Sequence, residues 1–572
     1  MVKFIKTSYS NILSIIGISI IILIFYFFCN KFSYNFFYQD DFHLLRFVTI
    51  FNDNSLNFQE KLNALYGLHN EHRIVFPRLF ALIDYYLQGH IDWQIFNVVS
   101  ALYYLGIFTF FALIIKKIKL PHWYMIPVAL FIFQPSSYQN FYWTISILQQ
   151  VGNLFWAMFL FYSLVYFKPE KFWISLFLII VLTFTHGNGL FAFGVGGLLL
   201  FLQKRFMQLG IWIGLMVIVA TCYFWGYYTA QNSNISGSLS NPVRLIGCFG
   251  GFWGGFIYDF FKNIYRVTFT ILWGLVVFIL LLLVNLKLLL NYISNNIRIK
   301  YQTYFPQENL FLLACFFYLT VTAVLVALSR SWISISAGFQ NRYLHNSVIA
   351  LILLYITILH YNSGLLRKSV GIIMLLIGLF FNIFSWYNNF ELLTFQRKSQ
   401  EADAVNYQFN KISIVNDKSF NSNIKSILEQ SYDQRVSIFP SSPLTAVVNN
   451  LDGFTTPQVT DYQIEIKMDS ILESNSISSN YKDIYYFNNF SLPYKGDVYI
   501  VMKSPKNTFI SPTGHRKNSK INLLKTGQFF TDGFVTTLMT NAMPKNEYQI
   551  GIIQKVHNRL IYIPTKYKIL TR

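Results

Sequence analysis

Long apolar runs separated by short polar loops make up the first two thirds of the chain. Several runs reach the ~20 residues that a helix needs to cross the hydrocarbon core of a bilayer. We therefore predict a mainly α-helical, polytopic membrane protein with about eleven transmembrane helices. The predicted helices cover residues 11–29, 94–115, 122–134, 145–167, 172–185, 189–202, 209–230, 267–290, 309–329, 344–361 and 369–387.

The first apolar run follows Lys3 and Lys6 and resembles a signal peptide at first sight. It is longer and more aromatic than a signal-peptide core, and it has no small-residue cleavage site. We expect it to be a retained membrane anchor.

The apolar, glycine-rich stretch 247–261 leaves two alternatives open. If it crosses the membrane, the count becomes twelve and Arg298 and Lys300 fall on the outer side, against the positive-inside rule. We favour a re-entrant or interfacial segment for this reason.

The distribution of Lys and Arg predicts the orientation of the helices. Basic residues cluster in alternate loops, which predicts that these loops and the N-terminus are cytoplasmic. They are Lys3, Lys6, Lys116, Lys117, Lys119, Lys168, Lys171, Lys204, Arg205, Lys287, Arg298, Lys300, Arg367 and Lys368. The loop 30–93, the turns at 134–142 and 185–189, the stretch 329–343 and the C-terminal region then face the other side.

The character of the chain changes after residue 387. The last 185 residues hold 15 of the 25 acidic residues and no long apolar run. Residues 388–450 have a helix-and-loop pattern, and from about residue 455 β-type runs alternate with turn signals. The clearest runs are 497–502, 529–538 and 548–553. We predict a transmembrane domain at 1–387 and a soluble periplasmic domain at 388–572 that ends in a small β-sandwich.

Composition supports the membrane class and adds a charge imbalance. The chain of 572 residues is 54% hydrophobic and 12% charged, and its net charge is +20. The excess basic residues mostly lie between apolar runs, which argues against a nucleic-acid partner. The four cysteines lie in or beside apolar runs and show neither metal-ligand spacing nor a disulfide pattern.

Acidic residues gather in the first predicted outer loop, residues 30–93. Only ten of them precede residue 388, and seven of these ten lie in this loop. Placing a carboxylate near a bilayer is energetically unfavourable, so a concentration of carboxylates indicates either a solvated loop or a functional site. The pair Asp40–Asp41, followed by His43, could supply a general base or ligands for a metal. The alternative is a helix N-cap with a solvated first turn.

The same loop carries an amphipathic pattern. Apolar residues recur at helical spacing over 63–87, which predicts an amphipathic helix on the membrane face, broken near Pro77. The polar cluster Asn70-Glu71-His72-Arg73 and then Arg78 lie on it. The alternative interpretation of this cluster is a solvated helix face with an internal ion pair.

Carboxylates and arginines on one membrane face suit transfer from a lipid-linked phosphate. Arginine can hold a phosphate or diphosphate bidentately, and a carboxylate can deprotonate an acceptor hydroxyl. The outward-facing candidates come from several loops: Asp40, Asp41, His43, Glu71, His72, Arg73, Arg78, His186, Arg330 and Arg342.

The layout of residues 1–387 resembles the GT-C class of membrane glycosyltransferases. The resemblance rests on the acidic pair after the first helix, the amphipathic helix in the first outer loop, the helix count and the outer C-terminal domain. Asn70-Glu71-His72-Arg73 and Arg342-Tyr343 are similar to bacterial members that modify envelope glycans and O-antigen of lipopolysaccharide.

The resemblance implies an inverting hexosyl or pentosyl transferase that uses a polyprenyl-phosphate sugar, of the undecaprenyl type, in the bacterial inner membrane. It implies that Asp40 or Asp41 is the base. Asp41 is favoured, because Asp40 is better placed to cap or orient. It also implies that outer-loop arginines bind the donor phosphate. No cofactor is required, although Asp40 and Asp41 could hold Mg²⁺ or Mn²⁺.

Other interpretations of single residues stay open. The glycines beside His186 could simply make a turn. Arg330 and Arg342 could be interfacial residues next to the anchors Trp332 and Tyr343. Asp259 would join the site only if 247–261 re-enters the membrane.

Two rival functions have to be separated from the transferase. A lipid-linked glycan transporter or flippase would need charged residues within the helices and a repeated half-structure, and we find no clear repeat. The other rival is a glycan polymerase of the O-antigen type or an acyltransferase. A polymerase would also use outer-loop arginines. The acidic pair directly after the first helix argues mildly against the polymerase.

Overall fold

The structure is a computed structural model. It describes residues 2–228, 234–261, 264–298, 305–414, 418–454, 463–475, 478–556 and 559–571. Lys300, which entered the orientation argument, lies outside the described residues, and so do residues 455–462, where the β-type pattern was expected to begin.

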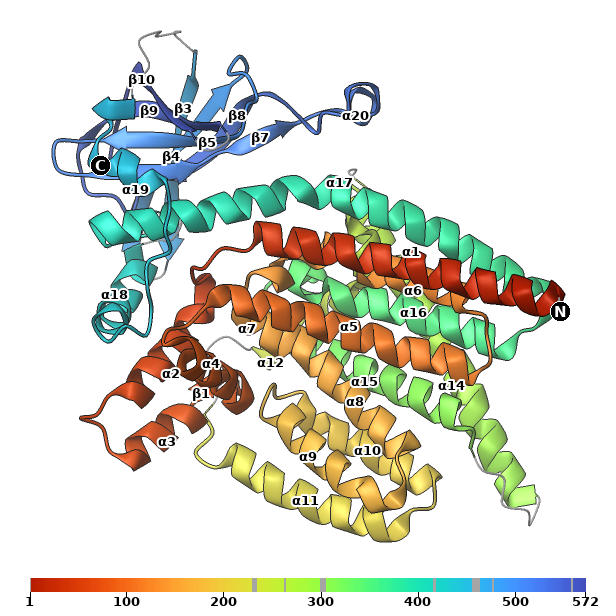
Figure 1. The fold of residues 1–572 in the computed structure, drawn as a ribbon. Coiled ribbons are helices and arrows are strands. Elements are labelled where there is room, and N and C mark those ends of the chain that lie inside the picture. Colours follow the sequence, from red (N-terminus) through yellow and green to blue (C-terminus); the bar gives the residue numbers. More distant parts are fainter. Residues whose placement is uncertain are drawn as a thin grey trace. The chain divides into compact units, whose positions relative to one another are not determined.

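The chain folds into two compact units (Figure 1). The helical unit comprises Met1–Lys31, Asp53–Ile83 and Ile95–Asn388. The C-terminal unit comprises Phe32–Asn52, Asp84–Gln94 and Asn389–Arg572. Two parts of the predicted first outer loop therefore fold with the C-terminal unit, whereas the sequence grouped the whole loop with residues 1–387.

Each of the eleven predicted apolar runs is helical over most of its described residues; residues 229 and 230, at the end of one run, lie outside them. The main helices that begin in the helical unit are α1 (Val2–Phe32), α3 (Phe58–Tyr66), α4 (Val75–Gln88), α6 (Met125–Ile132), α7 (Thr144–Ser146), α8 (Gly152–Tyr166), α9 (Phe172–Thr183), α10 (Gly189–Leu202), α11 (Phe206–Phe224), α12 (Ile235–Leu239), α13 (Pro242–Gly254), α14 (Arg266–Arg298), α15 (Gln307–Arg330), α16 (Leu344–Tyr361) and α17 (Gly364–Asn410). Helix α5 (Trp93–Lys117) begins two residues before this unit.

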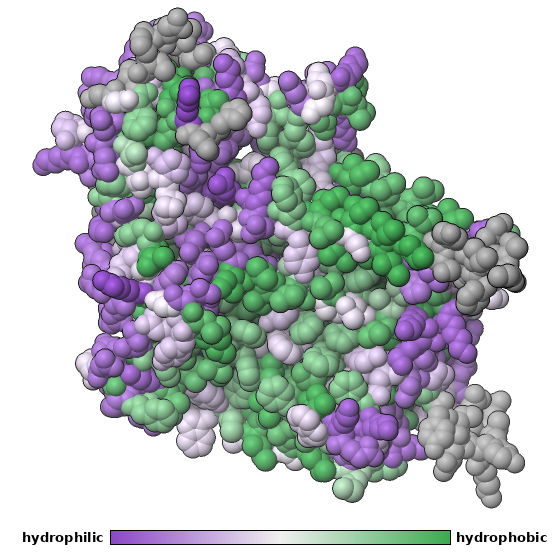
Figure 2. All heavy atoms as spheres, in the orientation of Figure 1, coloured by the Kyte–Doolittle hydropathy of each residue, from purple (hydrophilic) through white to green (hydrophobic). Residues whose placement is uncertain are grey.

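Within the described residues, eight helices are long and apolar enough to cross a membrane. They are Ser10–Phe32, Trp93–Lys117, Thr144–Tyr166, Phe206–Phe224, Arg266–Tyr292, Gln307–Arg330, Asn341–Tyr361 and Gly364–Asn410. Large apolar side chains on their outer faces are exposed, as Leu23, Ile218 and Leu376 illustrate. Figure 2 shows such hydrophobic side chains gathered over part of the molecular surface. The protein is therefore a multi-pass, membrane-embedded protein.

The remaining predicted spans, α6, α9 and α10, are shorter. Even α10, with 14 residues, extends only about 21 Å at 1.5 Å per residue, against a core of ~30 Å. Backbone carbonyls at the end of α6 accept hydrogen bonds from a side chain inside the helical unit. The Asn382 amide on α17 donates to the carbonyls of Leu130 and Phe133 at 2.8 and 3.0 Å. Irregular backbone is tolerated at membrane depth where the protein satisfies it in this way.

The stretch 247–261 forms the end of α13 and a 3₁₀ turn, Gly255–Phe260. Helix α13 has 13 residues and packs closely against α14 through glycines. A Cβ on Gly274 would lie 1.9 Å from the carbonyl oxygen of Gly250, and a Cβ on Gly254 would lie 2.0 Å from that of Thr270. Only hydrogen fits at these positions, so the two backbones pack at minimal distance.

The predicted amphipathic helix over 63–87, broken near Pro77, is helical at both ends and wrong at its centre. The segment forms the end of α3, a hairpin of β1 (Leu68–His69) and β2 (His72–Arg73), and α4. The break falls at Gly67, which ends α3, and not near Pro77. Pro77 lies in the first turn of α4, where its missing N–H costs no helical hydrogen bond.

The C-terminal unit ends in a β-sandwich. Its two antiparallel sheets have the strand orders β10-β9-β5-β6 and β3-β4-β8-β7. The strands are β3 (Glu465–Asn475), β4 (Ser478–Asn489), β5 (Asp497–Lys503), β6 (Thr508–Pro512), β7 (Gly514–Lys517), β8 (Phe530–Met539), β9 (Glu547–Val556) and β10 (Arg559–Leu570). The predicted strands at 497–502, 529–538 and 548–553 are confirmed as β5, β8 and β9.

Side chains along β5 point alternately to its two faces, and both faces are buried, which explains its continuous apolar sequence. Ile500 and Met502 enter the core that both sheets share. Tyr499 and Val501 point to the other face and pack on Ala402 of α17 and on Leu444 of α19 (Leu444–Asn449). Because β5 is buried on both faces, period-2 alternation of polar residues is lost.

The last part of α17 is joined to the sandwich by buried charged groups. The Lys398 ammonium donates to the carbonyl of Thr513. The Glu401 carboxylate accepts 2.8 Å hydrogen bonds from Ser442 and Tyr499, and Lys555 lies 3.6 Å away. Buried charges are tolerated because they are paired and hydrogen-bonded in this way.

Residues 32–52 pack on the C-terminal unit through α2 (Phe42–Asn52). The ring centroids of Phe42 and Phe420 lie 5.6 Å apart, and Phe420 belongs to α18 (Lys418–Asp433). The Gln400 amide donates to the Phe36 carbonyl at 2.9 Å. The acidic pair is thus a part of the C-terminal unit.

Candidate functional site

The acidic pair forms a 3₁₀ turn, Gln39–Asp41, that leads directly into α2. Asp41 is fully buried, and its carboxylate accepts a hydrogen bond from the Tyr38 backbone N–H at 3.1 Å. Asp40 is partly exposed. The capping role that the sequence suggested for Asp40 therefore falls to Asp41, and Asp40 is the more accessible carboxylate. The His43 ring lies against Phe42, with centroids 4.1 Å apart.

Negative charge gathers around Tyr38 in this unit. Burial raises the pKa of Tyr38, the side chain of Gln39 lowers it, and the carboxylates of Asp41, Asp40 and Asp403 raise it further. No group of three or more His, Cys, Asp or Glu side chains placed to hold a metal ion occurs among the described residues.

A second carboxylate, Glu71, lies in the helical unit at the tip of the β1–β2 hairpin. Its Oε1 atom accepts a charge-assisted hydrogen bond from Arg330 at 2.5 Å, at the end of α15. The same oxygen lies 3.9 Å from Nε2 of His72. Its Oε2 atom is buried and has no hydrogen-bond partner within the part of the chain that the structure describes. This oxygen is therefore free to accept a proton or a hydrogen bond from a ligand.

Two neutral imidazoles complete this group. The rings of His72 and His186 lie 4.0 Å apart, centroid to centroid. Burial lowers the pKa of His72 to about 3, with further lowering by His69 and Arg330. Burial and the neighbouring His72 hold the pKa of His186 well below its usual value; Glu71 opposes this shift and Arg330 adds to it. Both rings are uncharged at neutral pH. We call Glu71, His72, His186 and Arg330 the Glu71 cluster.

The glycines after His186 have two different roles. A Cβ on Gly189 would lie 2.4 Å from Cα of Thr183, so Gly189 is needed for the turn between α9 and α10. A Cβ on Gly187 would lie 2.9 Å from Nδ1 of His72 and 2.8 Å from the Tyr223 hydroxyl. Gly187 therefore makes room for His72, which the turn interpretation alone did not anticipate.

The guanidinium groups of Arg73 and Arg78 donate hydrogen bonds to backbone carbonyls of the protein itself. Arg73 donates to the carbonyls of Tyr223 and Tyr66, both at 2.6 Å, and of Trp225. Arg78 donates to two carbonyls at the end of α3, those of Leu65 and Gly67. Both arginines are buried. They tie the first loop to the end of α11 and satisfy the last carbonyls of α3.

Arg342 has a different environment. Its guanidinium lies over the rings of Trp143 and Tyr343, at 5.3 and 5.2 Å from their centroids. Its Nε atom is buried without a hydrogen-bond acceptor among the described residues. A guanidinium that lies over aromatic rings and has an N–H donor without an acceptor is suited to bind an anionic ligand.

Asn140, which the sequence did not single out, fixes the backbone at Arg342. Its amide nitrogen lies 3.3 Å from the Arg342 carbonyl, to which it donates, and 3.2 Å from Nδ1 of His345. Its side-chain oxygen accepts from Ser146 at 2.7 Å, and its backbone carbonyl accepts from Ser100 at 2.8 Å. Asn140 is fully buried, so it is a positioning residue. The sequence signal that could have indicated it is a turn rich in Ser, Gln, Asn and aromatic residues, 134–143, between two apolar runs.

A π-helical turn lies nearby in sequence, at Ile147–Val151 within the span 144–166. The amide nitrogen of Gln149 in this turn is buried without a partner in the described part of the chain. Such turns are frequent at functional sites. The pair Gln149–Gln150 in an apolar run was the sequence signal that could have indicated it.

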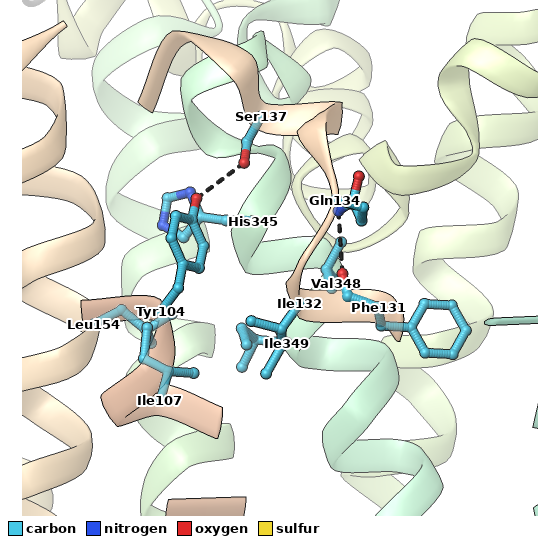
Figure 3. A pocket seen from close by; sticks show the side chains of 10 residues that line it. All are labelled: Tyr104, Ile107, Phe131, Ile132, Gln134, Ser137, Leu154, His345, Val348 and Ile349. Carbon is cyan, nitrogen blue, oxygen red and sulfur yellow. Dashed lines mark hydrogen bonds between the residues drawn. The ribbon is translucent and has the colours of Figure 1, made fainter. Parts of the chain in front are cut away.

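The cavity beside His345 is too small for a sugar (Figure 3). Its volume is about 10 Å³, which corresponds to about one water molecule. Tyr104 and Ser137 lie 3.0 Å apart, hydroxyl to hydroxyl, at its wall, and the Gln134 amide donates to the Phe131 carbonyl at 3.1 Å.

Comparisons of the chain with family models, with curated proteins and with solved structures find no match.

Proposed function

We propose that the protein is an inverting glycosyltransferase of the GT-C type. It transfers a sugar from a polyprenyl-phosphate-linked donor to a glycan, lipid or protein of the cell envelope. The observation that carries the proposal is the Glu71 cluster: a carboxylate with one oxygen that has no partner among the described residues, one guanidinium and two neutral imidazoles. It lies in a protein whose described residues include eight apolar helices of spanning length.

The reaction needs a proton acceptor and a stabilised leaving group. The acceptor hydroxyl attacks the anomeric carbon from the face opposite the phosphate, and its proton passes to a carboxylate. The bond between the anomeric carbon and the phosphate oxygen breaks, and the polyprenyl phosphate leaves with the electron pair. A carboxylate serves the first need and a guanidinium the second.

Two carboxylates are proposed as candidates for the base. Asp40, in the C-terminal unit, is more accessible than Asp41, which caps its own turn. Glu71, in the helical unit, has the unpartnered oxygen. We assign Arg342 to the donor phosphate because its Nε is unsatisfied, and Arg330 to orienting Glu71. A divalent cation is compatible with this scheme but is not required by it.

The proposed location is the bacterial inner membrane, with a cytoplasmic N-terminus and a periplasmic C-terminal domain. Support comes from the Lys and Arg distribution described above.

Mass spectrometry of cell-surface glycans tests the proposal. We compare cells that carry the wild-type protein, no protein, or one of the variants Glu71→Gln, Asp40→Asn and Asp41→Asn at equal protein level. Loss of one sugar decoration in the deletion strain and in Glu71→Gln or Asp40→Asn is the expected result. Glu60→Gln is the control, because Glu60 is an exposed carboxylate of the same loop that only caps α3.

Two results would overturn the assignment. If the deletion removes a glycan but none of the three carboxylate variants does, transport of a lipid-linked glycan replaces transfer. If the variants shorten a polymer without removing a decoration, the protein is a polymerase.

A further inference from the structure

The connection between β7 and β8 carries a short helix, α20 (Lys520–Thr526), in the C-terminal unit. Both of its ends are capped. The Ser519 hydroxyl accepts from the N–H of Asn522 at 3.2 Å, and Gly527, with φ of 70°, donates its N–H to the Leu523 carbonyl at 2.8 Å. A capped helix presents its side chains in fixed directions.

This helix exposes apolar side chains. Leu524 is 87% exposed and Ile521 is 66% exposed, and their spacing of three residues puts them on the same face. At 3.6 residues per turn, Lys520 and Lys525 flank this pair on either side. An apolar ridge with a lysine at each edge is the pattern of a helix that lies in a membrane interface.

Neighbouring residues extend the pattern along β7. The Arg516 guanidinium lies 3.8 Å from the centroid of the Phe490 ring, and the Phe490 side chain is exposed. The Lys517 ammonium lies 5.8 Å from the centroid of the Phe529 ring. Aromatic rings and basic groups together are typical of the boundary between lipid headgroups and acyl chains.

The charge of this segment has one sign. Between residues 513 and 531 the sequence holds Arg516, Lys517, Lys520 and Lys525 and no acidic residue. A basic, apolar surface is complementary to anionic phospholipid, to which each lysine or arginine near the surface adds attraction. The described part of the same chain has eight helices of spanning length, so this domain is tethered to a bilayer.

We propose that α20, with Phe490, Arg516, Lys517 and Phe529, is a membrane-anchoring surface that binds an anionic lipid bilayer. We call it the α20 surface. Ile521 and Leu524 enter the acyl-chain boundary, and Lys520 and Lys525 contact the phosphates of the headgroups. This interaction does not depend on the proposed transferase activity.

A fluorescent label on α20 tests the proposal in the full-length protein. Asn522→Cys is made in a Cys222→Ser background, because Cys222 is the exposed cysteine and the other three are buried. An environment-sensitive dye on this cysteine is followed in lipid nanodiscs. The discs contain phosphatidylcholine alone or phosphatidylcholine with phosphatidylglycerol, with and without acyl chains brominated near the headgroup.

The expected result is a blue-shifted emission that brominated lipid quenches, with stronger quenching when phosphatidylglycerol is present. Ile521→Gln/Leu524→Gln abolishes the quenching. Lys520→Gln/Lys525→Gln removes its dependence on phosphatidylglycerol. Leu570→Gln is the matched control, since Leu570 is another exposed apolar residue of the sandwich, and it leaves the signal unchanged.

Two results would overturn the proposal. An emission that matches the dye in water, with no quenching, means that the surface faces solvent. A blue-shifted emission that brominated lipid does not quench means that protein covers the surface. A concentration-dependent cross-link through the introduced cysteine then identifies a second copy of this chain.

Discussion

At the scale of single residues, the chemistry of the Glu71 cluster arises from positions that are far apart in sequence. Glu71 and Arg330 are 259 residues apart, and the hydrogen bond between them joins a loop hairpin to the end of α15. Burial beside Arg330 keeps His72 and His186 uncharged. Because the folded protein disfavours protonation of these buried rings, its stability is expected to fall at acidic pH.

The pH dependence of stability follows from the sign of the histidine shifts. The pKa of His72 is about 3 in the folded protein and about 6.5 in an unfolded chain. Between these values the unfolded chain binds a proton that the folded one does not, so stability falls as pH falls through 6.5. The loss is ~1.4 kcal/mol per pH unit, or roughly 2 kcal/mol at most between pH 6.5 and 5.

Thermal unfolding in detergent at pH 7.5 and at pH 5 measures this effect. We expect the melting temperature of the wild type to drop at pH 5, and the drop to be smaller in His72→Gln. His90→Gln serves as the control, because His90 lies outside the cluster and is partly exposed. An equal drop in wild type and His72→Gln would mean that the folded protein protonates His72 freely.

At the scale of elements, glycine contacts decide how closely helices pack. The contact of α13 with α14 depends on Gly250, Gly254 and Gly274, whose missing side chains let the two backbones touch. A side chain at any of these positions would force the helices apart. This contact fixes the short segment 242–254 against a helix of spanning length.

Gly274→Ala should therefore destabilise the helical unit. The new Cβ would meet backbone atoms of α13, which cannot rotate away, and overpacking of this kind costs about 1–3 kcal/mol. The measurement is the melting temperature in detergent. Gly214→Ala is the matched control, because a Cβ at Gly214 in α11 meets nothing within 4 Å. A similar melting temperature for both variants would show that α13 and α14 separate without cost.

At the scale of the whole molecule, the short helices decide the topology. Eight crossings alone would return the chain to its starting side. Helices α9 and α10 follow one another and add two crossings or none. Whether the total number of crossings is odd or even therefore depends on α6 and on the stretch 247–261. The buried partners of the α6 carbonyls favour α6 as part of an interrupted crossing.

A topology reporter fused after Arg572 checks this point. We predict that the reporter is exocytoplasmic, which requires an odd number of crossings. A second reporter in the loop after α14, where the sequence predicts a cytoplasmic location, serves as the control. A cytoplasmic signal at Arg572 would mean that α6 does not cross, or that 247–261 crosses as well.

Local sequence patterns were sufficient to predict the membrane class of the protein and most of its helices and strands. Eleven apolar runs are helices, and the strands β5, β8 and β9 lie where alternating and β-branched residues predicted them. These features depend on local periodicity and on the transfer of apolar side chains out of water, which act over a few residues. The first-loop helix was wrong because Gly67 and the left-handed Asn70, with φ of 50°, favour a hairpin over the apolar periodicity.

Long-range folding selected which polar residues lie together. It joined Glu71 to Arg330 and His72 to His186. It also turned Arg73 and Arg78 toward backbone carbonyls, and buried Asp41 as a cap while Asp40 stayed accessible. Local sequence cannot determine such partners, because a guanidinium binds whichever acceptor the fold brings within about 3 Å. The residue types limit the chemistry, and long-range packing selects which groups perform it.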